Sequence, residues 1–315
     1  MPALSELRDT IERETPAWLA ESDLASVSRE KIRDWLDGKK DRFNASVPSW
    51  YEQIYMEEIR RYCLSRLLSD DRHMPLASLV RTGYSSFLYK AGIKTASPAQ
   101  GLPFDFQHFA FYQALVISVG WRAETELMAR VAFKMMQPLF DGGHVVWSLP
   151  WFMLDLTRDW LGADVNLRDQ DRKDDILVGW RPLLDKWRVP DPAEFDVVLK
   201  AAADYHLEQS HVHIEVGHDE DRNYRSAHFE IEPSEYWLFP VELFAVLRLR
   251  EWEGLANPEL THPLFNKTQL GRMPSIQEPT SDPVMDAVDA KFRSLYPGTP
   301  SIADLPSLRA EQSTS

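Results

Sequence analysis

The chain has one cysteine in 315 residues, Cys63. A single cysteine excludes an internal disulfide and any zinc site built from cysteine ligands. Because Cys63 lies between Tyr62 and Leu64 in an apolar helical pattern, we expect its thiol to be buried, with a raised pKa. A cysteine nucleophile is therefore not expected.

Glycine is also scarce, at 13 residues, where a typical protein has a share of about 7%. Phosphate-binding loops and β-rich folds use glycine in their turns, so the scarcity favours helices. The sequence contains no GxGxxG, phosphate-loop GKS/GKT, GxSxG or HExxH motif. These motifs mark dinucleotide sites, nucleotide-binding loops, serine hydrolases and zinc proteases. We therefore predict a protein without catalytic residues, cofactor or metal.

Long apolar runs are missing as well. The first 16 residues, "MPALSELRDTIERETP", are polar and contain no apolar core of a signal peptide. No apolar run reaches the ~20 residues that span a bilayer. These features predict a cytoplasmic protein that does not interact with membranes.

Positive charge is in deficit, with 35 basic against 49 acidic residues and a net charge of −14. Such a chain repels nucleic acid phosphates, so direct binding of DNA or RNA is not expected. Acidic charge suits a basic protein partner, although it also serves solubility alone.

Apolar residues at three- and four-residue steps predict a mainly α fold. Helices are expected at 48–68, 74–92 (closed by Gly92), 104–119, 124–137 and 148–161, and the third is apolar nearly all round. An acid-rich linker, "ADVNLRDQDRKDDI", follows Gly162 and divides two helical modules. We predict an N-terminal helical module at 1–163 and a C-terminal one at 164–280. A short helix and a loosely ordered, proline- and serine-rich tail are predicted at 281–315.

The stretch "SHVHIEVGHDEDRNYRSAHFEIEP", 210–233, changes from helical to alternating periodicity. Alternation of polar and apolar residues is typical of half-buried strands, and the polar run after Gly217 supplies a turn. We therefore predict a β-hairpin at 211–232 on the C-terminal module. Upstream, His206 is expected to be a core histidine whose hydrogen bonds are satisfied.

Two interpretations of this hairpin remain open. In the first, His211, His213 and His228 bind a metal from one strand face, which would make the protein a metal-dependent hydrolase. In the second, the acidic tip Asp219–Asp221 contacts a basic protein. We favour the second, because histidines on the polar face of a hairpin need no metal.

The residues after the hairpin, "SEYWLFPVELFAVLRLREWEGLANPELTHPLFNKTQL", resemble the C-terminal module of the PoNi-type immunity proteins. The resemblance covers about 174–270. Its strongest points are Tyr236-Trp237 and Phe239 opening an apolar helix, and His262-Pro263 with Leu270 closing the segment. It implies a mostly helical bacterial protein that neutralises a polymorphic DNase toxin.

The resemblance and the charge together predict a cytoplasmic immunity protein that occludes the active cleft of a cognate DNase effector. A helical adaptor or chaperone for an effector is a further alternative. The expected toxin-binding residues are acidic side chains of the hairpin and linker, together with the two aromatic residues that follow the hairpin: Glu215, Asp219, Glu220, Asp221, Glu230, Glu232, Asp171, Asp174, Tyr236 and Trp237.

Overall fold

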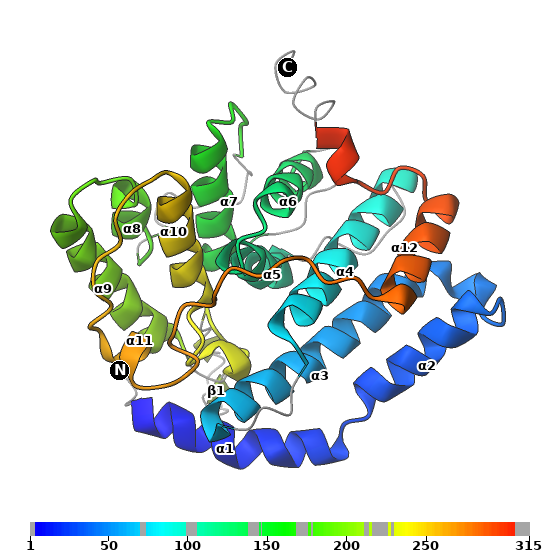
Figure 1. Cartoon of the computed structure of the whole chain (residues 1–315), viewed down its shortest axis with the longest axis horizontal. Helices are drawn as coiled ribbons and strands as arrows, with labels where there is room; N and C mark the ends of the chain where they lie inside the picture. The colour runs from blue at the N-terminus through cyan, green and yellow to red at the C-terminus, as the bar shows by residue number, and fades with distance from the viewer. Residues whose placement is uncertain are drawn as a thin grey trace, which may run out of the picture.

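The computed structural model describes residues 4–69, 74–98, 106–137, 145, 147–167, 176–177, 179–210, 214–215, 226–227 and 230–305. These parts are mainly helical, so the predicted mainly α fold is confirmed (Figure 1). In chain order the α-helices (α) and 3-10 helices (η) are α1 (Leu4–Glu21), α2 (Leu24–Leu36), η1 (Asp41–Ser46), α3 (Val47–Leu68), α4 (Leu76–Ala96), α5 (Phe106–Ser118), α6 (Arg122–Met135), α7 (Ser148–Leu161), α8 (Arg181–Lys186), α9 (Pro192–Gln209), η3 (Ser234–Tyr236), α10 (Val241–Trp252), α11 (Pro263–Asn266), α12 (Pro283–Leu295) and η4 (Ile302–Asp304).

Helix α5 lies at the centre of the molecule, with α4, α6, α7 and α10 packed around it (Figure 1). Its sequence explains this position, because a helix that is apolar on every side has to be buried. Phe109, Leu115 and Val116 are completely enclosed, which confirms the predicted central helix. None of the helices in the described ranges combines the length and the apolar character needed to cross a lipid bilayer.

The hydrophobic core continues across the predicted boundary at residue 163. Buried residues from both predicted modules belong to one cluster. For example, the ring of Phe111 on α5 stacks on Tyr236, with ring centroids 4.0 Å apart. The core therefore does not divide where the acid-rich linker occurs in the sequence. Residues 168–175 of that linker lie outside the described residues.

Cys63 on α3 is buried, as predicted. Its thiol donates a hydrogen bond to the backbone oxygen of Glu235, at 3.2 Å. Burial raises the pKa of Cys63 well above its usual value, and the nearby Glu235 carboxylate adds to the rise. The thiol is therefore a packing group that joins α3 to η3.

Helix α12 packs against α2 through a second, smaller cluster that includes Val288 and Phe292. The predicted short helix at the C-terminus is therefore present. The expectation of a loose tail is corrected for residues 297–305, because Thr299 is buried. Arg293 also donates hydrogen bonds to the backbone oxygens of Thr299 and Pro300, at 2.9 and 3.0 Å. Residues 306–315 lie outside the described residues.

Helix α4 does not end at Gly92, as its sequence suggested, but continues to Ala96. A Cβ atom at Gly92 would lie 2.2 Å from Oγ1 of Thr299. Glycine is present here because the C-terminal segment approaches the helix closely, and not because the helix stops.

Replacing Gly92 with alanine should therefore destabilise the protein. We expect a loss of about 1–3 kcal/mol from overpacking, which exceeds the gain of about 1 kcal/mol in helix propensity. Urea denaturation followed by circular dichroism measures the change. A double variant, Gly92→Ala with Thr299→Ala, should recover part of the loss because it removes the clashing oxygen. Unchanged stability of the single variant would contradict this explanation.

Residues 272–282, called the strap below, lie in the connection from α11 to α12 and run in an extended path across other helices (Figure 1, orange). Gln277 fixes the strap in place. Its N–H donates to the oxygen of Val119 at 2.9 Å, and its backbone oxygen accepts from the indole of Trp121 at 2.7 Å. Its side-chain oxygen accepts from the N–H of Ala77 at 3.0 Å. The strap thus joins α4 to the turn between α5 and α6.

Candidate functional site

The acid-rich stretch at 211–229, called the acidic segment below, leaves the end of α9 and returns before η3. Two pairs of its residues are described, β1 (Ile214–Glu215) and β2 (Ser226–Ala227). They pair antiparallel, with Ile214 opposite Ala227. Residues 211–213, 216–225 and 228–229 lie outside the described residues, so the extent of the predicted hairpin stays a prediction.

The two ends of the acidic segment are held together. We call Gln209, Ser210, Glu230 and Ile231 the base. The N–H of Ile231 donates to the oxygen of Gln209 at 3.1 Å, and a β-bridge joins Ser210 to Ile231. The indole of Trp237 donates to the oxygen of Ile231 at 2.8 Å. The acidic segment therefore starts and ends at a point fixed by backbone hydrogen bonds.

His206 on α9 lies one helical turn before Ser210 of the base and is completely buried. Its Nε2 is 3.1 Å from the backbone oxygen of Trp237, and its Nδ1 is 2.6 Å from Oε1 of Glu242. A carbonyl oxygen only accepts, so Nε2 carries a hydrogen. The bond from Nδ1 to Glu242 then needs one more proton, on either partner, and the pair is neutral overall in both cases. His206 is thus the satisfied core histidine that the sequence predicted.

Glu230 acts as a cap on α7 in the structure. Its Oε2 accepts hydrogen bonds from the N–H groups of Ser148 and Leu149, at 2.8 and 3.1 Å. Burial raises the pKa of Glu230, and the hydrogen bonds from Ser148 and Leu149 oppose this rise. Glu230 as a toxin contact stays a prediction; in the structure its carboxylate binds the first turn of a helix whose N–H groups need acceptors.

Two substitutions separate the hydrogen bonds that Glu230 accepts as a cap on α7 from the effect of its charge. Alanine leaves the α7 N–H groups without their acceptor and should cost about 1–2 kcal/mol. Glutamine keeps an acceptor oxygen, so at pH 7 it should cost nothing. Because folding raises the pKa of Glu230, the part of its contribution to stability that depends on pH is fully present below the unfolded pKa and is lost as pH rises through the folded pKa, whereas the hydrogen bonds of the cap remain. The stability of wild type relative to Glu230→Gln should therefore fall with rising pH in urea titrations. Equal losses for both variants would argue against the cap.

Tyr236 and Trp237 are each only 2% exposed. The Tyr236 hydroxyl is hydrogen-bonded to that of Tyr55, and burial raises the pKa of Tyr236 well above its usual value. The prediction that these two residues contact a toxin is therefore corrected. They attach the base to α3 and α5, and almost no surface of either residue is open to a partner.

The other predicted contact residues are resolved only in part. Glu232 is partly exposed beside the base, and the structure describes only the backbone of Glu215. The remaining predicted contacts and the histidines of the metal hypothesis lie outside the described residues: Asp171, Asp174, Asp219, Glu220, Asp221, His211, His213 and His228. Within the described ranges, no three His, Cys, Asp or Glu side chains come together as a metal site.

The structure adds an acidic surface that the sequence analysis missed, on the last two turns of α9. Asp204 and Glu208 are exposed there, and Glu208 directly precedes the base. Asp204 accepts a hydrogen bond from Nε2 of His262, at 3.2 Å. The signal was available, because Asp204 and Glu208 are four residues apart and opposite the buried Phe195 face. This surface extends the negative charge from the acidic segment onto a rigid helix.

A scan against models of known protein families finds no match to this chain. Searches of curated proteins and of solved structures find none either. The resemblance to the PoNi-type immunity proteins, and the function that it implies, therefore stay predictions.

Proposed function

We propose that this chain is a cytoplasmic immunity protein that binds a DNase toxin and inhibits it by occluding its basic cleft. The observation that carries the proposal is the fixed base, from which an acidic segment with Asp219, Glu220 and Asp221 at its centre starts and ends. The acidic end of α9 adjoins the same base.

Electrostatics explains how such an arrangement would inhibit a nuclease. A DNase binds a phosphate backbone, so its cleft is basic. Carboxylates that take the place of the phosphates would block that cleft without any chemistry. The net charge of −14 would also steer a basic toxin toward the protein, with association rates approaching about 10⁸–10⁹ M⁻¹s⁻¹ at low salt.

The fixed base contributes to affinity in a second way. Ordering a flexible loop on binding costs free energy, and holding both its ends in place before binding reduces that cost. The buried hydrogen bonds of Trp237 and His206 hold the ends in this protein. The base would therefore act as the support of the contact region, without itself touching the toxin.

The experiment is co-expression with the toxin that we predict the neighbouring gene to encode. Growth should be rescued, and the purified pair should form a stoichiometric complex without nuclease activity. The complex should also weaken as salt is raised, because exposed charges are screened. A complex that still cleaves DNA, or failure to bind any basic nuclease encoded beside it, would refute the proposal.

A further inference from the structure

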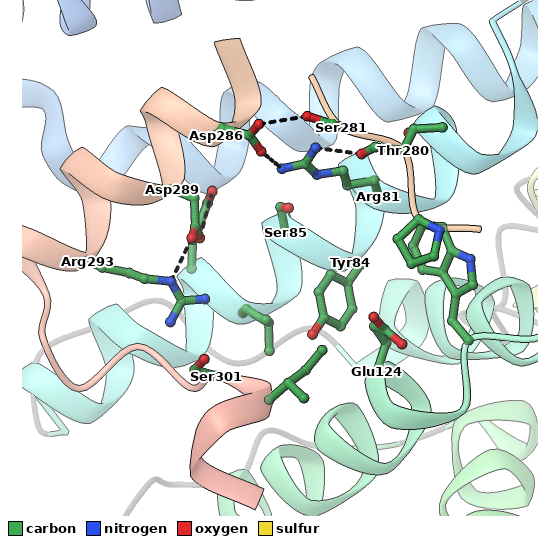
Figure 2. Close-up of a pocket in the computed structure, with 15 residues that line it drawn as sticks. Arg81, Tyr84, Ser85, Glu124, Thr280, Ser281, Asp286, Asp289, Arg293 and Ser301 are labelled. Carbon is green, nitrogen blue, oxygen red and sulfur yellow. Dashed lines mark hydrogen bonds and ion pairs between the residues drawn. The ribbon is translucent and has the colours of Figure 1, made fainter. Parts of the chain in front are cut away.

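A pocket of about 370 Å³ lies far from the base, between α4, α6, α12 and the strap (Figure 2). Charged side chains line it from three helices. They are Arg81 on α4, Glu124 on α6, and Asp286, Asp289 and Arg293 on α12. The pocket contributes nothing to the immunity function proposed above, so its groups call for a separate explanation.

Both arginines of the pocket are already neutralised. Arg81 donates to Asp286 at 2.5 Å and to the backbone oxygen of Thr280 at 2.7 Å. Arg293 donates to Asp289 at 2.8 Å, and its Nη1 is used by backbone oxygens. Figure 2 shows these pairs along the α12 side of the pocket. They hold α12 and the C-terminal segment in place, and they offer little positive charge to an anionic ligand.

Glu124 differs from the other charged groups. Within the described residues it forms no ion pair, and burial raises its pKa, with the Glu278 carboxylate adding to the rise. The lining therefore carries three carboxylates against two guanidinium groups. Glu124 is thus a partly buried negative charge without a counter-ion in the described parts of the chain.

Tyr84 lies next to Glu124 in the pocket (Figure 2). Burial raises the pKa of Tyr84, and the negative charge of Glu124 raises it further. The hydroxyl group of Tyr84 forms no hydrogen bond with any described residue. Its oxygen can therefore accept from an N–H donor that also reaches Glu124.

We propose that this pocket binds a small organic cation, an alkylammonium ion, with the ammonium group on Glu124 and the Tyr84 hydroxyl. The ring of Tyr84, which is partly exposed, adds an aromatic group beside Glu124, and aromatic rings attract cations. Ile302, which is exposed, supplies apolar surface for the methylene chain. A calcium ion fits less well, because it takes six to eight oxygen ligands and two of the three carboxylates are held by arginines.

Binding of putrescine and of propylamine to the purified protein tests the proposal by isothermal titration calorimetry. We expect saturable binding at one site, and no binding of the uncharged 1-propanol. Glu124→Gln should weaken amine binding about 10- to 100-fold, the usual range for a hydrogen bond to a charged group. Tyr84→Phe should weaken it less, because only a neutral acceptor is lost.

Glu30→Gln is the matched control, because it removes the same charge from an exposed position on α2. It should leave amine binding unchanged. Circular dichroism checks that every variant is folded. Absence of amine binding to the folded wild type, or equal binding by Glu124→Gln, overturns the proposal. Toxin inhibition is measured separately, so failure of the amine site leaves the immunity proposal standing.

Discussion

Replacing His206 with leucine should lower the free energy of unfolding by about 3–5 kcal/mol, because it leaves Glu242 buried without its partner. Oε2 of Glu242 already has no hydrogen-bond partner among the described residues. The substitution removes the remaining bond to Oε1 and also leaves the oxygen of Trp237 unpaired. Since folded proteins are stable by about 5–15 kcal/mol, this loss should be visible as an earlier transition in urea.

A double variant distinguishes the buried pair from simple loss of packing. Replacing both His206 and Glu242 with leucine removes both polar groups, and such replacements are often neutral or stabilising. The double variant should therefore be more stable than His206→Leu alone. Glu242→Leu alone completes the comparison. If the losses of the two single variants simply add up to the loss of the double variant, His206 and Glu242 are not coupled.

The same substitution should act on the base of the acidic segment. Ser210 Oγ donates to the backbone oxygen of His206 at 2.8 Å, and Trp237 links His206 to Ile231. Weakening this set should speed hydrogen exchange at the N–H of Ile231 before global unfolding. Exchange at α5, which lies at the centre of the molecule, should change only with global stability.

The helices could be predicted because their apolar residues recur at helical spacing. Helix α5 is the clearest case, since a segment apolar on every side has one stable location. The end of α7 is another, because Gly162 adopts a left-handed conformation with φ of 58°. Glycine accepts this conformation at little cost. In both cases the local sequence alone decides the structure.

Gly92 shows where local reasoning ends. A glycine after an apolar run reads as a helix end, yet the residue that requires it, Thr299, is distant in the sequence. Glu230 is similar, because alternation indicates which face of a strand is polar but does not reveal that the N-terminus of α7 lies opposite. Tyr236 and Trp237 were expected at the surface because they follow the acidic hairpin, and the sequence does not show that Tyr55 and Phe111 pack against Tyr236.

The pocket proposed to bind an amine could not be predicted from the sequence. Its walls come from α4, α6, the strap, α12 and the segment after it, and no motif connects them. Glu124 reads as an ordinary acid in the first turn of α6, where a carboxylate is usual. Only the pairing of Arg81 with Asp286 and of Arg293 with Asp289 shows that Glu124 is the carboxylate left over.

Changing Asp219, Glu220 and Asp221 together to lysine should weaken toxin binding by at least ~100-fold, because close charge pairs at interfaces couple by about 1.5–7 kcal/mol. Most of the loss at low salt should be in the association rate, since steering depends on the charge that the toxin meets first. Surface plasmon resonance at two salt concentrations measures both rates, and co-expression measures the loss of growth rescue.

The control reverses three other acids, Glu21, Asp23 and Glu30, which are exposed on α1 and α2 or between them. It changes the net charge by the same amount, so it separates a local contact from the general attraction of an acidic protein. A local contact requires the first triple variant to bind far more weakly than the control while both remain folded. If the two variants lose the same affinity, overall charge accounts for the capture. If neither loses affinity, the acidic segment is not where the toxin binds, and the exposed acids Asp204 and Glu208 on α9 become the next surface to reverse.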